Sequence, residues 1–236
     1  ASVAPATAAI VGIPRRVRSS QPQRGARIDW ANPLTSRLST AIVFNGPAYD
    51  AVSGSLLTST SFGSAPNISA GTKGLGLAGS GGGVALTGKN FQLPSEYTVT
   101  YLVSLSAVDA SYGGVISIAN SAGTETAFQI QRDSATDAFA VSTSTASYGV
   151  ASGGSISGLV GKYACITCTR TASGTKLVIN AVATTGTAGT VGTIGNGRIV
   201  IFGERTLSAT MGSDGLAYGL YIHNRALSDT EIKSLS

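Results

Sequence analysis

The sequence has little charge, few aromatic side chains and almost none of the residues that most often carry chemistry. Charged residues make up 11% of its 236 positions, against roughly 25% in an average soluble domain. There is a single histidine, His223, and spacing pairs no serine or cysteine with it as a nucleophile with its base. We therefore expect His223 to have a structural or surface role.

Paired carboxylates are missing too. No strand-like segment has two carboxylates two residues apart, so the acid and nucleophile of a retaining glycosidase have no candidates. Asp50, Asp109, Asp137 and Asp214 stand apart in sequence, whereas Ca²⁺ takes about six or more oxygen ligands, usually from several carboxylates. We expect a protein that is not an enzyme, with no catalytic residue, no bound metal and no cofactor.

The two cysteines do not indicate a disulfide. Cys165 and Cys168 are three residues apart, so in a strand they point to opposite faces of the sheet. A Cys-x-x-Cys zinc site would need two further ligands, and the chain has one histidine. We predict two buried thiols, which fits synthesis in the cytoplasm. No apolar run reaches the roughly 18 residues of a membrane-spanning helix, so no membrane partner is expected.

The charge that is present lies mostly at one end. Residues 1–28 contain five arginines and no acidic residue, and the net charge of the whole chain is +5. The other 11 basic residues are matched by 11 acidic ones, so the pI of 9.4 reflects a basic tail and not a nucleic-acid-binding face on the rest. Three prolines and the lack of a hydrophobic period predict an extended basic arm over residues 1–28. A single domain is predicted over residues 29–236.

The arm allows three interpretations. An apolar tip beside the arginines favours a tether that becomes ordered on an acidic neighbouring protein. A solvated tail is the alternative, and nucleic-acid binding is a third, which the absence of aromatic side chains from the arm disfavours. On the first interpretation, the partner-binding residues are Ile10, Val11, Ile13, Arg15, Arg16, Arg18, Arg24 and Arg27. Trp30 is then predicted to fill the place where the arm meets the domain.

The domain has the pattern of an all-β protein. Residues 97–105 show strict alternation, which predicts that the side chains of one face are buried. These side chains are Tyr97, Val99, Tyr101, Val103 and Leu105. Further strands separated by turn residues, as in a β-sandwich, are predicted at 38–46, 113–120, 126–132, 137–143, 198–204 and 216–223.

Three finer predictions concern connections and faces. Residues 163–170 and 176–182 predict a hairpin across 171–175, whereas 47–83 read as loop-rich. Within 216–223, one face is predicted to hold Leu216, Tyr218, Leu220 and Ile222. At the C-terminal end, Ser228 and Glu231 have the spacing of a capping box, and Leu227 and Ile232 that of a hydrophobic staple, which predicts a short helix.

The closing segment also carries a family resemblance. GLAYGLYIHNRALSDTEIKSL, residues 215–235, is similar to the end of the laminin-G-like, concanavalin A-like jelly rolls: a final strand, an Asn-Arg-Ala-Leu-Ser turn and a short helix. YTVTYLVSL (97–105), GKYACITCTRTASGTKLVINAV (161–182) and RIVIFGE (198–204) resemble earlier strands of the family in the same order. The resemblance covers about residues 30–236 and implies an antiparallel β-sandwich jelly roll. The family often has tryptophan where this chain has Tyr101 and Tyr163.

The opening IDWANPLTSRL (28–38), behind a basic arm, resembles laminin-G-like proteins encoded by tailed bacteriophages. That resemblance implies a non-enzymatic virion structural protein: a capsid decoration (cement) protein on the virion surface, anchored through its arm. Its partners would be capsid or other virion proteins, without direct nucleic-acid contact, and a homo-oligomer is expected on a symmetric shell.

The alternative is a carbohydrate-binding module or adhesin, including the receptor-binding part of a phage tail. Such a protein would bind surface glycans. Tyr112 and Tyr148 lie in predicted loops and are the candidate carbohydrate contacts, because a tyrosine ring can stack on a sugar ring. The alternative is that they cover loop edges or lie at a subunit contact.

Overall fold

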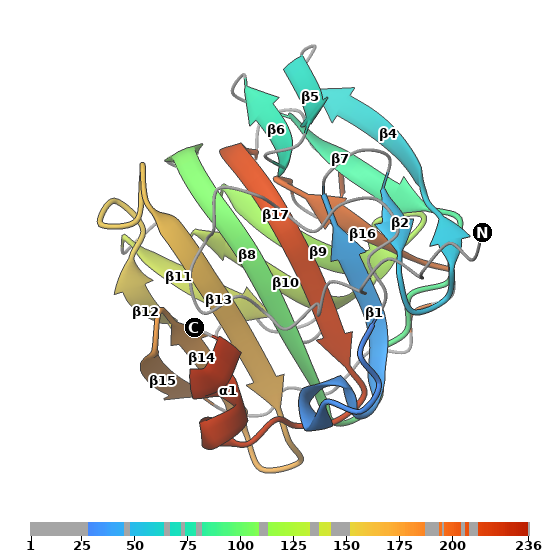
Figure 1. The fold of residues 1–236 in the computed structure, drawn as a ribbon. Helices are drawn as coiled ribbons and strands as arrows, with labels where there is room; N and C mark the ends of the chain where they lie inside the picture. The colour runs from blue at the N-terminus through green and yellow to red at the C-terminus, as the bar shows by residue number, and fades with distance from the viewer. Residues whose placement is uncertain are drawn as a thin grey trace, which may run out of the picture.

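In the computed structural model, two antiparallel β-sheets pack face to face, and one short helix lies against the outside of the first sheet (Figure 1). The structure describes residues 28–44, 48–63, 67–71, 74–78, 82–108, 113–132, 137–142, 152–186, 194, 196–203, 206–207 and 212–235. This architecture confirms the predicted all-β sandwich. The arm, residues 1–28, lies outside the described residues except for Ile28, so it stays a prediction.

Sheet A contains most of the long strands. Its path from edge to edge is β15 (Val182–Gly186), β14 (Thr175–Ile179), β13 (Tyr163–Arg170), β8 (Tyr97–Val108), β17 (Ser213–His223), β1 (Leu38–Val43), β2 (Tyr49–Asp50) and β3 (Ser55–Leu56). In addition, β6 (Gly74–Ala78) pairs with β17, and β5 (Asn67–Gly71) pairs with β6. The central strand β17 therefore holds together segments from both halves of the sequence.

Sheet B forms the second layer. Its order is β12 (Ser152–Ser155), β11 (Ala138–Ser142), β10 (Thr126–Arg132), β9 (Gly114–Asn120), β16 (Gly197–Ile201), β7 (Gly82–Thr87) and β4 (Thr58–Gly63). Consecutive strands β9, β10, β11 and β12 pair as a meander, whereas β16 returns to lie between β9 and β7. β9, β10 and β11 have strong strand composition, and strands that follow one another along the chain often pair as neighbours.

The hydrophobic core lies between the two sheets, and β8 contributes five side chains to it. All five alternating side chains of 97–105 are buried there at 0–1% exposure, as their alternation predicted. The Tyr97 ring meets Phe128 of sheet B edge to face, with ring centroids 6.2 Å apart. Cys168 belongs to this core, whereas Cys165 is buried on the opposite face of sheet A. The prediction of two buried thiols on opposite faces is therefore confirmed.

The interpretation of residues 47–83 as loop-rich is wrong. This stretch contains β2 to β6 and the start of β7, including the edge strands of both sheets. Its serine, threonine and glycine residues give no hydrophobic alternation, because β3 and β4 are edge strands with mostly exposed side chains. The hydrophobic pattern of the sequence therefore did not indicate these strands.

The hairpin across 171–175 is confirmed, but its second strand is shorter than predicted. β14 ends at Ile179, and Asn180 and Ala181 form a tight turn into β15. Both turn residues have positive φ, 47° and 71°, as a two-residue type I′ hairpin turn requires. Residues 176–182 are thus a strand, a turn and the first residue of the next strand.

The start of the domain departs from one expectation. Asn32 caps a single 3₁₀ turn, η1 (Pro33–Thr35), by accepting a hydrogen bond from the Leu34 amide at its side-chain oxygen, 3.0 Å away. Trp30, predicted to fill the junction of arm and domain, is 60% exposed. Most of the indole is open to solvent, so the prediction that it fills this junction is wrong.

Candidate functional site

The residues predicted to bind partners or carbohydrate lie outside the described residues. These are Ile10, Val11, Ile13, Arg15, Arg16, Arg18, Arg24, Arg27, Tyr112 and Tyr148. Their roles stay predictions. The structure instead brings together aromatic residues that sequence reasoning did not select.

Three tyrosines gather on the outer side of sheet A, and we call them the tyrosine face: Tyr163 of β13, and Tyr218 and Tyr221 of β17. The rings of Tyr163 and Tyr218 have centroids 5.7 Å apart and are tilted by 58°. Both are partly exposed, whereas Tyr221 is buried at 5% exposure. Since β8 separates β13 from β17, the first two rings reach toward each other across it.

A bulge in β17 puts Tyr218 on this face. The register against β8 shifts between Ala217 and Gly219, which leaves Tyr218 as an extra residue. Ala217, Leu220 and Ile222 therefore face the core, and the prediction that Tyr218 shares a face with Leu220 is wrong. One inserted residue reverses the alternation of side chains along a strand.

The same register shift corrects the prediction for Leu216. Leu216 lies opposite Ser104 and is only partly buried, and it does not belong to the core cluster. Gly219, directly after the bulge, makes room for an aromatic ring: a β-carbon there would lie 3.2 Å from the ring and from the hydroxyl of Tyr221. The sequence signal that could have revealed the tyrosine face is therefore Tyr-Gly-Leu-Tyr, with glycine as the bulge marker.

A buried apolar cluster lies under the tyrosine face on the outer side of sheet A. Leu102, Cys165 and Val178 project from neighbouring strands on the outer side of sheet A. Helix α1 (Asp229–Leu235) adds Ile232 and Leu235, both buried. The thiol of Cys165 lies 3.5 Å from the Leu235 carbonyl oxygen, so the helix sits directly on the sheet. The tyrosines are thus held on packed, rigid elements.

The hydroxyls of the tyrosine face are neutral at physiological pH. Burial raises the pKa of Tyr163 and of Tyr218 above the ordinary value of 10, and that of Tyr221 to about 12. Protonated phenols can donate and accept hydrogen bonds but do not act as general bases near neutral pH. The arrangement can therefore stack on a ring and hydrogen-bond to hydroxyl groups.

The outer side of sheet B is the other polar surface. Ser117, Gln129 and Gln131 point away from the core, since they alternate with the core residues of β9 and β10. Their exposure is 0%, 2% and 4%, and the two glutamine side chains hydrogen-bond to each other. These three side chains are shielded from solvent, whereas two rings of the tyrosine face are partly exposed, so the tyrosine face is the better candidate site among the described residues.

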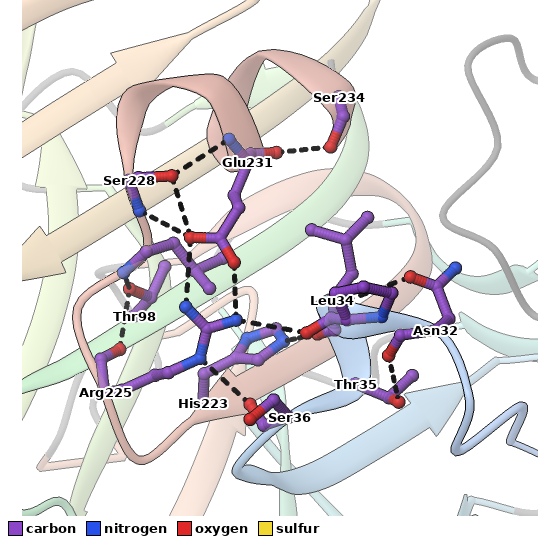
Figure 2. A network of polar contacts seen from close by, with 12 residues as sticks. Asn32, Leu34, Thr35, Ser36, Thr98, His223, Arg225, Ser228, Glu231 and Ser234 are labelled. Carbon is purple, nitrogen blue, oxygen red and sulfur yellow. Dashed lines mark hydrogen bonds and ion pairs between the residues drawn. The ribbon is translucent and has the colours of Figure 1, made fainter.

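A polar network closes the domain beside α1 (Figure 2). Arg225 binds Glu231 through two hydrogen bonds of 2.7 and 3.0 Å, and its Nε donates to the Ser36 carbonyl at 3.0 Å. Ser228 and Glu231 form the predicted capping box, with the Ser228 amide 2.8 Å from the carboxylate. The predicted staple partners Leu227 and Ile232 are both buried in the cluster under the helix.

His223 belongs to the same network. It is 1% exposed, and its Nε2 lies 2.8 Å from the Leu34 carbonyl. Because a carbonyl only accepts, Nε2 carries the proton. Burial lowers the pKa of His223, although the bond to Leu34 acts in the opposite direction. The uncharged His223 side chain thus connects the last strand to η1 through a hydrogen bond, in agreement with its predicted structural role.

Four of the described carboxylates form ion pairs with lysine or arginine: those of Asp50, Asp137, Asp229 and Glu231. Lys89 lies 2.6 Å from Asp50, which is fully buried, and Lys176 lies 2.5 Å from Asp229. Burial alone would raise the pKa of Asp50, but hydrogen bonds from Lys89, Ser53 and the Ala41 amide lower it below 3.8. Among the described residues, no three His, Cys, Asp or Glu side chains gather as a metal site would require. No helix in the described part is long and apolar enough to span a membrane.

Two solved structures show the same fold. Domain 4 of AbnA, an extracellular arabinanase from Geobacillus stearothermophilus in complex with arabinotriose, matches with a TM-score of 0.65 and 15% identity over 85% of this chain and 98% of that domain. Trypanosoma rangeli sialidase in complex with sialic acid matches with a TM-score of 0.60 and 16% identity over 84% of this chain. The match spans about a third, 32%, of the sialidase.

No curated protein sequence matches the chain. A family model of the laminin G type does match, over residues 78–233, which include the tyrosine face and the Arg225–Glu231 ion pair of the closing network. The matched region contains the central strands of both sheets and most of α1. The chain belongs to the concanavalin A-like lectin/glucanases superfamily.

Proposed function

We propose that the chain is a carbohydrate-binding domain without catalytic activity, and that a sugar ring packs on the tyrosine face. The observation that carries this proposal is the pair of partly exposed rings, Tyr163 and Tyr218, whose centroids lie 5.7 Å apart above a buried apolar floor. Ligand sites combine apolar surface with a few fixed polar groups, and this face has both.

The chemistry of a sugar suits these side chains. One face of a pyranose or furanose ring presents C–H groups, which pack on an aromatic ring, while the hydroxyl groups at its rim need hydrogen-bond partners. A tyrosine offers an apolar body with a polar tip. Because the two rings are tilted by 58°, a sugar can lie on one ring and hydrogen-bond to the hydroxyl of the other.

The relatives give limited support. The arabinanase domain was solved with arabinotriose, and that domain has almost the same extent as this chain. An identity of 15% relates the folds alone, so it supports a carbohydrate-compatible scaffold and not a particular sugar. Ion pairs hold the described acids Asp50, Asp137, Asp229 and Glu231, which makes these four poor candidates for the acid or nucleophile of a hydrolase.

A glycan array tests this proposal. We expect saturable binding of the full chain to at least one class of oligosaccharide, and loss of that binding in the variant Tyr163→Ala/Tyr218→Ala. Tyr49→Ala is the matched control, since Tyr49 is also a tyrosine on sheet A, is 45% exposed and lies outside the tyrosine face. No saturable binding by the wild type, or equal binding by the double variant, would refute the proposal.

A second function, virion decoration, is favoured by one observation on the sequence. Five arginines and no acid lie in residues 1–28, whereas the remaining charges balance. Such a segregated charge suits an arm that is anchored on an acidic neighbouring subunit, with the neutral domain displayed outside. The phage context comes from the resemblance of the opening motif.

Co-sedimentation with phage particles tests this second function. Replacing Arg15, Arg16, Arg18, Arg24 and Arg27 by serine should prevent incorporation while the thermal transition of the domain stays unchanged. Full incorporation of the serine variant would exclude an arginine tether.

A further inference from the structure

Strand β15, Val182–Gly186, forms one edge of sheet A. It pairs with β14 on one side, and no described strand pairs with its other side. Its sequence, Val-Ala-Thr-Thr-Gly, contains no proline and no charge, the devices that usually protect an edge strand. Val182 is 69% exposed, the highest value among the large apolar side chains of the described residues.

The turn before β15 fixes which backbone groups point outward. In a two-residue hairpin, the residues flanking the turn, Ile179 and Val182, form a hydrogen-bonded pair, and bonded and non-bonded pairs then alternate. Thr184 and Gly186 therefore bond to β14. The N–H and C=O groups of Ala183 and Thr185 point away from β14, to the free edge.

This edge is complementary to itself. If a second copy of the strand approaches antiparallel, with a two-fold axis at Thr184, Ala183 of each copy lies opposite Thr185 of the other. About four main-chain hydrogen bonds can then form, two in each such pair. Each edge offers the two residues that the other needs, in the same spacing, as a two-fold interface requires.

Charge does not oppose this contact. On the adjacent strand β14, Lys176 lies opposite Thr185, and its ammonium is 2.5 Å from Asp229. Two copies would therefore not bring unpaired like charges together. β4, one of the two edge strands of sheet B, is a weaker candidate, because its exposed side chains at Thr58, Ser59, Thr60 and Ser61 are all polar.

We propose that β15 pairs antiparallel with β15 of a second copy of this chain, which joins the two A sheets into one continuous sheet. Because the two-fold axis of such a pair is perpendicular to the sheet, the outer faces of both A sheets look in the same direction. Both tyrosine faces would then be presented to one surface. Two binding sites on one surface would raise the avidity for a multivalent glycan. That consequence rests on the proposed function, whereas the dimer itself does not.

Sedimentation velocity of the full chain over a range of concentrations tests the dimer. The wild type should pass from monomer to dimer, and Ala183→Pro should weaken dimerisation at least tenfold, because it removes only an outward N–H and keeps the hydrogen bonds to β14. Ala183→Ser, which retains the N–H, is the matched control and should dimerise like the wild type.

Two variants of opposite charge test the same dimer if the proline variant fails to fold. Ala183 and Thr185 are exposed, so Ala183→Lys/Thr185→Lys and Ala183→Glu/Thr185→Glu should fold and each stay monomeric, while their mixture forms a heterodimer. A wild type that is monomeric at all concentrations, or a dimer unaffected by these variants, would overturn the proposal. None of these measurements contains a glycan, so a failed glycan array leaves their outcome unchanged.

Discussion

Tyr218 illustrates how much a single residue decides in this protein. As the extra residue of the β17 bulge, it lies beside Tyr163 on the outside of sheet A instead of in the core. Strict alternation without the bulge could not place both Ala217 and Leu220 in the core with Tyr218 on the outer face. The candidate site therefore depends on one irregularity of the backbone and on Gly219 beside it.

Tyr101 is a second residue with a specific consequence. Its hydroxyl is fully buried, has no hydrogen-bond partner among the described residues, and burial raises its pKa far above 10. A buried hydroxyl without a partner costs about 1–3 kcal/mol, so Tyr101→Phe should leave the free energy of unfolding unchanged or raise it by about 1 kcal/mol. Urea denaturation measures this change.

Tyr97→Phe is the matched control. This substitution also removes a hydroxyl group from a fully buried tyrosine. The Tyr97 hydroxyl, however, donates a hydrogen bond to the Ala127 carbonyl at 3.4 Å. Tyr97→Phe should therefore not stabilise the protein. A clear loss of stability in Tyr101→Phe would show that its hydroxyl has a partner.

At the scale of elements, the closing segment is the part best predicted from sequence. The capping box, the staple and the helix all occur where their residues indicated, because each is a local motif that a few side chains determine. Strands with strict alternation, such as β8, were equally clear. The strands within 47–83 were not, because their side chains are small, polar and at sheet edges.

The candidate site could not be predicted for a different reason. Tyr163 and Tyr218 belong to strands far apart in sequence, and they meet across β8 only because of the sheet order and the bulge. Sequence reasoning selected loop tyrosines, Tyr112 and Tyr148, which lie outside the described residues. Strand order and bulges are tertiary properties that a pattern along one segment does not contain.

The closing network predicts a pH dependence. The bond to Arg225 lowers the pKa of Glu231 from its ordinary value of 4.5 to about 2, and the Ser228 bonds act in the same direction. Since the folded-state pKa is lower than the unfolded one, the contribution of Glu231 is complete above about pH 4.5 and is lost as the pH falls toward 2.

Thermal unfolding of the wild type and Glu231→Gln across this range measures the effect. The difference in melting temperature between the two proteins should be constant above pH 5 and shrink steadily below 4.5. Because Glu231 is partly exposed, we expect a modest difference that decreases in high salt. A difference that does not change with pH would contradict the ion pair with Arg225.

The start of β16 gives a prediction on packing. A β-carbon on Gly197 would lie 1.8 Å from the Phe91 carbonyl oxygen, so the two backbones would have to separate. The Phe91 amide donates a hydrogen bond to the Gly197 carbonyl oxygen, 3.1 Å away, and this bond joins the two backbones. Gly197→Ala should therefore lower the free energy of unfolding by about 1–3 kcal/mol or more.

Gly158→Ala is the control for this substitution. Its nearest neighbour to a new β-carbon is the Ser155 carbonyl oxygen at 3.4 Å, an ordinary contact, so it should change stability by less than about 0.5 kcal/mol. Equal effects of the two substitutions in denaturant titrations would show that β16 and the Phe91 backbone can separate without cost.

At the scale of the whole molecule, the elements that stabilise the sandwich lie apart from the surface proposed to bind carbohydrate. The core between the sheets, the ion pair of Lys89 with Asp50 and the closing network hold the domain together, while the outer side of sheet A presents the tyrosines. The superfamily places the chain among lectin-like and glucanase folds, but a fold does not specify a ligand. Carbohydrate binding at the tyrosine face is therefore the central claim about this protein's function.

A calorimetric titration tests this claim most directly, with the oligosaccharide that binds best on the array and three proteins: the wild type, Tyr218→Phe and Tyr218→Ala. We predict that Tyr218→Phe, which keeps the ring, binds within a few-fold of the wild type. Tyr218→Ala should lose at least tenfold in affinity, equivalent to about 1.4 kcal/mol. Wild-type affinity in Tyr218→Ala, with its fold intact, would contradict the assignment of the tyrosine face as a carbohydrate site.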